Sequence, residues 1–155
     1  MSLPRDFIAE SNRIEGIHRE PTDAEIDALD RFLATDTVTR SNLISLTTVF
    51  QPDARLRDRP GLNVIVGTHR PSPGGPHIAS ALDDILGRVF RDEHPYPVHV
   101  AYETLHPFTD GNGRSGRALW LWGMGRRSRR EREQAWELGF LHCWYYQSLE
   151  FSRKD

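Results

Sequence analysis

The sequence is poor in the features that mark secreted or membrane-bound proteins. Its 155 residues include one cysteine, Cys143, so the chain cannot form an internal disulfide. No apolar run approaches the length that spans a bilayer, and the first residues carry no signal-peptide core. The formal net charge is only −2, which argues against nucleic acid or an anionic membrane as the main partner. We therefore expect a cytoplasmic protein that binds neither membrane nor nucleic acid.

The remaining composition is ordinary for a globular domain. Hydrophobic residues make up 37% and charged residues 27% of the chain. A chain of this length can bury a sizeable core in a single unit. The sequence therefore predicts one domain over residues 1–155.

Apolar residues recur at helical spacing in four segments, which predicts amphipathic helices. The first residues of one of them, Thr-Asp-Ala-Glu at 22–25, are typical of a helix N-terminal cap. The polar residues 126–133 are expected to form a solvated helix or loop, because glutamates are interspersed among the arginines. The four apolar helices are expected over residues 7–17, 22–33, 39–50 and 79–90.

Residues 62–78 begin with an apolar run typical of a strand and then break into a turn rich in proline and glycine. This pattern predicts a short, irregular β-hairpin. A plain connector between helices is the alternative. His69 and His77 lack the spacing of a metal-binding motif and are expected at the surface.

The most informative stretch is residues 106–117, His-Pro-Phe-Thr-Asp-Gly-Asn-Gly-Arg-Ser-Gly-Arg. Its Asp-Gly-Asn-Gly segment is typical of a turn, and the apolar run at 117–122 indicates a buried helix after it. A glycine-rich turn that enters a helix directs backbone N–H groups and the positive end of the helix dipole toward one anion. Arg114 and Arg117 are three residues apart and share one helical face, where they could hold separate groups of one polyphosphate.

Two further side chains of this stretch suggest chemistry. Asp110 offers the oxygen ligands that Mg²⁺ takes together with phosphates. His106 belongs to the residue type that best suits proton abstraction near neutral pH. The alternative is an ordinary hairpin turn that follows a strand over residues 98–102.

Residues 106–117 resemble the signature of the Fic-domain family, His-Pro-Phe-x-Asp/Glu-Gly-Asn-Gly-Arg-x-x-Arg, at every specified position. Residues 11–16, Ser-Asn-Arg-Ile-Glu-Gly, resemble the inhibitory motif that some members carry N-terminal to this signature. The plain alternative is that Glu15 is a solvated helix carboxylate.

The resemblance implies a mostly α-helical Fic fold with a small β-hairpin flap over the active site. Residues 1–20 would form an inhibitory helix, 62–78 the flap, and 106–117 the signature loop and helix start, after a helix over 98–105. The implied activity is transfer of AMP from ATP, with Mg²⁺, to a Ser, Thr or Tyr hydroxyl of a target protein. The target is unidentified and can be the chain itself. A homo-oligomer is a further open partner.

The resemblance also assigns roles to individual residues. Glu15 would pair with Arg117 and withdraw that guanidinium from the γ-phosphate of ATP. The catalytic base would be His106 and the Mg²⁺ ligand Asp110. The phosphate-binding residues would be Gly111, Asn112, Gly113, Arg114 and Arg117; the inhibitory residues would be Ser11, Glu15 and Gly16; and the target-docking residues of the flap would be Val64, Ile65, Val66 and Gly67.

Other functions remain open for this sequence. The same site could remove AMP from a protein, with Glu15 orienting a water, or could transfer another phosphate-containing group. The chain could also be a nucleotide-binding regulatory module without catalysis. The presence of His106 argues against that last reading, because binding alone needs no base.

Overall fold

The computed structural model describes residues 3–136, and these residues fold into seven α-helices. Cys143 lies outside the described residues. The prediction of a mostly α-helical fold is confirmed. The helices are α1 (Leu3–Ile14), α2 (Asp23–Leu33), α3 (Arg40–Phe50), α4 (Pro76–Phe90), α5 (Pro95–Leu105), α6 (Asn112–Met124) and α7 (Arg129–Ala135).

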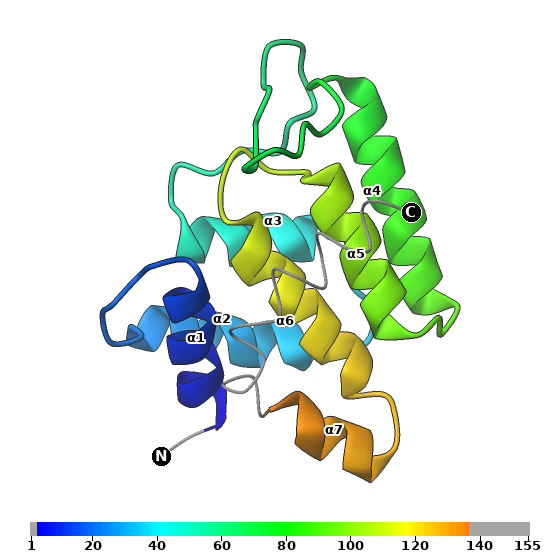
Figure 1. Cartoon of the computed structure of the whole chain (residues 1–155). Coiled ribbons are helices and arrows are strands. Elements are labelled where there is room, and N and C mark those ends of the chain that lie inside the picture. Colours follow the sequence, from blue (N-terminus) through cyan, green and yellow to red (C-terminus); the bar gives the residue numbers. More distant parts are fainter. Residues whose placement is uncertain (1–2, 137–155) are drawn as a thin grey trace.

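Helix α6 lies at the centre of the fold, and α1, α2, α3, α5 and α7 pack against it (Figure 1). Ten of its 13 residues are buried, including both arginines of the signature. A helix that is enclosed on most sides normally carries apolar residues all round. The start of α6 departs from this pattern, because Asn112, Arg114, Ser115 and Arg117 are buried there.

Local sequence signals explain most of the helix boundaries. Thr22 and Thr39 each form a capping box with the third residue of the following helix, as predicted for residues 22–25. Proline opens both α4 and α5, where its missing N–H costs nothing. Helix α1 begins and ends about one turn earlier than the predicted segment 7–17. The alternative of a strand over residues 98–102 is wrong, because these residues belong to α5.

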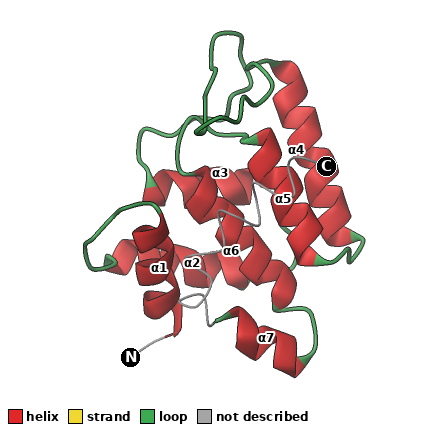
Figure 2. Cartoon of the chain, in the orientation of Figure 1, coloured by secondary structure: helices red, strands yellow, loops and turns green. Residues whose placement is uncertain are grey.

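The segment between α3 and α4 is a long loop that projects at the top of the molecule in Figure 1. The expected β-hairpin is not formed as two strands: within residues 3–136 there is no strand, and the loop is closed by one antiparallel bridge between Val66 and His69 (Figure 2). Gly67, with φ of 58°, supplies the tight turn. Pro71 and Pro73 lack the N–H groups that a longer ladder would need.

A second bridge joins the loop to the signature. Leu56 pairs with Phe108 in antiparallel fashion, with the N–H of Arg57 donating to the Pro107 carbonyl and that of Thr109 donating to the Arg55 carbonyl, both at 2.8 Å. The loop is therefore fixed to the residues that follow His106. Among the described helices, none is long and apolar enough to cross a membrane.

Candidate active site

His106 stands at the C-terminal end of α5 in a left-handed backbone conformation, with φ 53° and ψ 64°. Its N–H still donates to the Tyr102 carbonyl at 2.8 Å, and Pro107 prevents the helix from continuing. The imidazole Nδ1 lies 3.3 Å from the carbonyl oxygen of Glu103 and 3.9 Å from its carboxylate. With 14% of its side chain exposed, the histidine is held by α5 yet reaches the surface.

Contacts between α5 and α6 fix the histidine relative to the helix that follows the signature loop. The Tyr102 hydroxyl lies 2.7 Å from the hydroxyl of Ser115, and the Nδ1 atom of His99 lies 2.9 Å from the Gly116 carbonyl oxygen. Burial raises the pKa of Tyr102 well above its usual range, so the phenol stays neutral beside Ser115. The two helices therefore act as one rigid support.

The signature loop is closed by Asn112. Its side-chain oxygen accepts from the N–H of Phe108 and its side-chain nitrogen donates to the Phe108 carbonyl, both at 2.8 Å. Phe108 is fully buried and anchors the loop in the core. The amide of Asn112 thus closes the loop on itself and fixes the backbone that leads into α6.

The loop leads to an uncapped helix N-terminus. Gly111 is the N-cap of α6 with φ of 77°, and no side chain caps the helix. The N–H groups of the first turn therefore have no intrahelical acceptor and coincide with the positive end of the helix dipole. Asp110 is exposed beside them, with one carboxylate oxygen 2.7 Å from the Gly111 nitrogen. This arrangement favours an anion next to an oxygen ligand.

Arg117 is buried, and helix α1 holds its guanidinium. Nε donates to the Ser11 hydroxyl at 2.8 Å, and Nη2 donates to the Ser11 carbonyl at 3.0 Å and to Oε1 of Glu15 at 2.7 Å. Gly16, with φ of 73°, forms the turn that follows. A Cβ atom at Gly113 would collide with Oε1 of Glu15, so this carboxylate lies directly over the start of α6.

Arg114 lies on the same helix but is held by α3. Its guanidinium donates to the Phe50 carbonyl at 2.9 Å and to the Gln51 side-chain oxygen at 3.2 Å. Its Nε is buried without a partner. Burial lowers the pKa of Arg114, and the nearby carboxylates of Glu15 and Asp110 oppose that shift. The two arginines of the signature are therefore positioned by different helices.

A cleft of about 500 Å³ brings most of the predicted site residues together. Its lining includes Glu15, His106, Asp110, Gly111, Asn112, Gly113, Arg114, Val64, Ile65 and Val66. Four predicted site residues are not part of the lining: Ser11, Gly16, Gly67 and Arg117. Arg117 and Ser11 are buried behind Glu15, which separates them from the cleft.

The residues of the cleft fit a nucleotide polyphosphate with Mg²⁺. The unpartnered Nε of Arg114, the uncapped N-terminus of α6 and the absence of a Cβ at Gly113 all suit phosphate oxygens. No group of three or more His, Cys, Asp or Glu side chains that could hold a metal occurs in the described part of the chain. Asp110 would therefore share Mg²⁺ with phosphate oxygens and water, which is the usual manner of this ion.

Three residues near the site were not predicted from the sequence. Glu103 is three residues before His106 on the same helix, a spacing that could have indicated its proximity. Gln51 follows the end of α3 and Arg57 lies in the polar loop, where the sequence offers several similar arginines. For these two residues no sequence signal was available, because their partners lie about 50 positions or more away.

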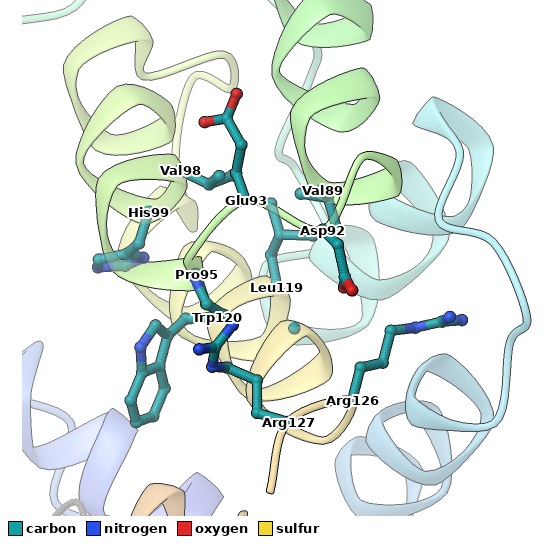
Figure 3. Close-up of a pocket in the computed structure, with 11 residues that line it drawn as sticks. Val89, Asp92, Glu93, Pro95, Val98, His99, Leu119, Trp120, Arg126 and Arg127 are labelled. Carbon is teal, nitrogen blue, oxygen red and sulfur yellow. The ribbon is translucent and has the colours of Figure 1, made fainter. Parts of the chain in front are cut away.

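A second, much smaller hollow of about 10 Å³ lies between the C-terminal end of α4, the start of α5 and the far end of α6 (Figure 3). Leu119 and Pro95 form part of its wall, and Asp92 and Arg126 stand at its rim. None of the cleft-lining residues contributes to it. The cleft around His106 is the candidate active site because it gathers His106, Asp110 and Arg114 at one place.

Comparison with known proteins agrees with this choice. No curated protein matches the chain. Residues 80–122 match the family model of the Fic/DOC family. The matched segment runs from α4 through the signature loop into α6, and it does not include α1. The match thus supports the Fic-domain family for the part of this chain that carries His106.

Proposed function

We propose that this chain is a protein adenylyltransferase that transfers AMP from ATP to a hydroxyl side chain of a target protein, and that Glu15 restrains it. The observation that carries the proposal is the shared cleft of about 500 Å³, which His106 and the N-terminal end of α6 line together. A base and an anion site in one cleft are what transfer to a hydroxyl requires. A Fic-type enzyme generally moves a nucleotidyl or other phosphate-containing group, and AMP is the specific group proposed here.

The proposed reaction uses His106 as the general base. A proton on Nδ1, donated toward the Glu103 carbonyl 3.3 Å away, places the lone pair on Nε2. Nε2 takes the proton of the target hydroxyl as its oxygen bonds to the α-phosphorus of ATP. The bond between the α-phosphorus and the bridging oxygen breaks, and pyrophosphate leaves with that electron pair.

The other cleft residues bind and orient the substrates. The first-turn N–H groups of α6 and the guanidinium of Arg114 bind phosphate oxygens, and Arg117 binds the γ-phosphate once it is free of Glu15. Bound Mg²⁺, held by Asp110, would neutralise charge on the phosphates. The apolar edge at Val64–Val66 lines the cleft and gives a target segment a place to lie.

The contact between α1 and Arg117 supports autoinhibition. The Arg117 guanidinium, only 1% exposed, is occupied by the three hydrogen bonds that it donates to Ser11 and Glu15. The Glu15 carboxylate lies at the start of α6, so a γ-phosphate there would meet a like charge and lose its cation. A misplaced γ-phosphate shifts the α-phosphorus away from the attacking oxygen, and such misalignment costs transfer rate.

Glu15 also lines the cleft with about a third of its side chain exposed, which favours one second function. A carboxylate in the cleft that holds His106 can orient a water, so the same site could hydrolyse AMP from a modified protein.

Isotope labelling tests the proposal. Wild type, Glu15→Gly and Glu15→Gly/His106→Ala are incubated with Mg²⁺ and ATP labelled at the α- or γ-phosphate, with cell lysate and the protein itself as acceptors. We expect label from α-ATP alone, more of it with Glu15→Gly, and none with the double variant. Glu20→Gly, whose side chain is 88% exposed, is the matched control and should behave as wild type.

Each other outcome contradicts a defined part of the proposal. Label from γ-ATP would replace AMP transfer by phosphoryl transfer. Equal labelling by wild type and Glu15→Gly would remove the inhibitory role of Glu15. Loss of label from a purified AMP-protein only when Glu15 is intact would favour hydrolysis. Nucleotide binding without any label would favour a non-catalytic regulatory module.

A further inference from the structure

Arg57 is a fully buried arginine in the loop between α3 and α4, with 0% of its surface exposed. None of the ion pairs formed within residues 3–136 involves it. Burial lowers the pKa of Arg57 without the offset that a carboxylate would give. A buried guanidinium without a counter-ion persists only if hydrogen bonds satisfy it. Its position is therefore determined by the acceptors around it.

Two of these acceptors are the last carbonyls of the helix that carries the proposed base. Nε donates to the carbonyl of His106 at 2.6 Å and Nη2 to that of Leu105 at 2.8 Å. Carbonyls at a helix C-terminus have no intrahelical donor, and they form the negative end of the helix dipole. Arg57 thus satisfies the end of α5 where His106 takes its left-handed conformation.

The other two acceptors are at opposite ends of the loop that lines the cleft. Nη1 donates to the carbonyl of Ser72 at 2.8 Å and to that of Leu62 at 3.2 Å. Between these two residues lie Val64–Val66, which form one side of the cleft. A single planar group therefore binds both ends of the proposed target-docking loop and the backbone of the proposed base.

We propose that Arg57 is a positioning residue that holds the target-docking loop and the His106 imidazole at a fixed position relative to each other. The four hydrogen bonds of Arg57 fix the distance between Val64–Val66 and the His106 imidazole. Val64–Val66 would receive the target, and the imidazole would take the proton of the target hydroxyl. Rate in such a reaction depends on this distance, because the attacking oxygen must be in line with the α-phosphorus. The inference rests on the proposed function and adds a residue outside the signature to it.

The geometry requires arginine and not merely a positive charge. A guanidinium presents five N–H groups in one plane, and here four hydrogen bonds spread from it to two separate backbone segments. A lysine ammonium has three donors at one point and cannot reach both segments together. Arg57→Lys should therefore retain the charge and lose part of the coupling.

The test compares Arg57→Met and Arg57→Lys with Arg59→Met, all in the Glu15→Gly background. Arg59 is the matched control because its side chain is 83% exposed. Four quantities are measured: the affinity for ATP with Mg²⁺, the rate of AMP transfer at saturating ATP, amide hydrogen exchange at Val66 and His69, and the NMR signal of the His106 imidazole.

For Arg57→Met we expect a transfer rate about tenfold to a hundredfold lower, because the reacting groups lose their alignment. Exchange at Val66 and His69 should accelerate by at least about tenfold as their bridge opens, and the imidazole signal should shift. The ATP affinity should stay within about twofold, since α6 binds the phosphates. The transfer rate and amide exchange of Arg57→Lys should fall between those of Arg57→Met and those of the Glu15→Gly parent. Arg59→Met should match the Glu15→Gly parent in all four quantities.

Three results would overturn the inference. Arg57→Met could match Arg59→Met in exchange, imidazole signal and rate. Exchange could accelerate equally in α4 and α6, with Arg57→Lys behaving the same, which would make Arg57 a general stability residue. ATP affinity could fall together with the rate, which would place its effect on nucleotide binding. If the Glu15→Gly parent transfers no AMP to any protein, the proposed function fails. Amide hydrogen exchange and the NMR signal of the imidazole still decide whether Arg57 positions both the α3–α4 loop and the end of α5.

Discussion

Replacement of Glu15 by glutamine tests whether the contact with Arg117 stabilises the fold at the expense of nucleotide binding. Oε1 of Glu15 lies 2.7 Å from Nη2 of Arg117, and the two side chains are 32% and 1% exposed. A hydrogen bond to a charged group contributes about 1.5–3 kcal/mol. Solvent screening of the partly exposed carboxylate reduces this one to about 1 kcal/mol. Glutamine keeps the shape of the side chain and removes its charge.

Two changes of opposite direction should follow. Without nucleotide, the free energy of unfolding should fall by about 1 kcal/mol, which corresponds to a melting temperature about 2–4 °C lower for a chain of this size. The affinity for ATP with Mg²⁺ should rise by about fivefold, because the same free energy no longer opposes binding of the γ-phosphate. ADP lacks the γ-phosphate, so its affinity should stay unchanged.

Urea unfolding and calorimetry measure these quantities, with Glu20→Gln as the control. The side chain of Glu20 is 88% exposed and lies 3.5 Å from Arg5, so its loss should alter neither stability nor binding measurably. A Glu15→Gln protein that loses stability but binds ATP as wild type does would refute the competition. Equal gains for ATP and ADP would refute it as well, because the γ-phosphate would then play no part.

Three further predictions concern other parts of the structure. In the Glu15→Gly background, His106→Ala should lower AMP transfer by at least about a hundredfold with ATP affinity unchanged, and comparable rates would exclude it as the base. Burial alone would raise the pKa of Glu25, but hydrogen bonds, foremost those from Arg19, lower that pKa below its ordinary value. The contribution of Glu25 to stability is therefore complete above the ordinary pKa of the carboxyl and is lost as the pH falls through its folded-state pKa, so acid titrations of unfolding should show less loss of stability for Glu25→Gln than for wild type. Gly111→Ala should cost about 1–2 kcal/mol in urea unfolding, because φ is 77° and a Cβ would come within 3.0 Å of Thr47 Cγ2; an unchanged midpoint would contradict that strain.

Local order could be predicted where neighbouring residues determine it. The capping boxes at Thr22 and Thr39 depend on residues three positions apart, and the helical periodicity of α2, α3 and α4 is contained in single segments. The polar segment 126–133 likewise forms a turn and then the start of α7, whose Glu131 has its pKa lowered to about 2 by hydrogen bonds from Arg127 and Ser128. Each of these features needs only local hydrogen bonds and spacing.

The loop between α3 and α4 shows where such reasoning fails. The run Val64–Val66 has strand propensity, yet only Val66 pairs, with His69. The loop takes its shape from distant groups instead. Arg57 binds the carbonyls at both of its ends, and the imidazole Nε2 of His69 lies 2.9 Å from the Thr104 carbonyl oxygen of α5. Backbone carbonyls carry no residue-specific signal, so a sequence cannot identify them as partners.

The sequence by itself determined a mostly helical chain and the chemical groups of its signature, because turn propensity, helical period and residue type are local properties. Only the tertiary structure decided how those groups are used. It assigned Arg114 to the end of α3, used the amide of Asn112 to close its own loop, and positioned Arg57 between the α3–α4 loop and the helix of His106. The contact between Glu15 and Arg117, 102 positions apart, was implied beforehand only by the family resemblance. These outcomes depend on which elements pack against α6, and packing is settled by the whole core and not by any one segment.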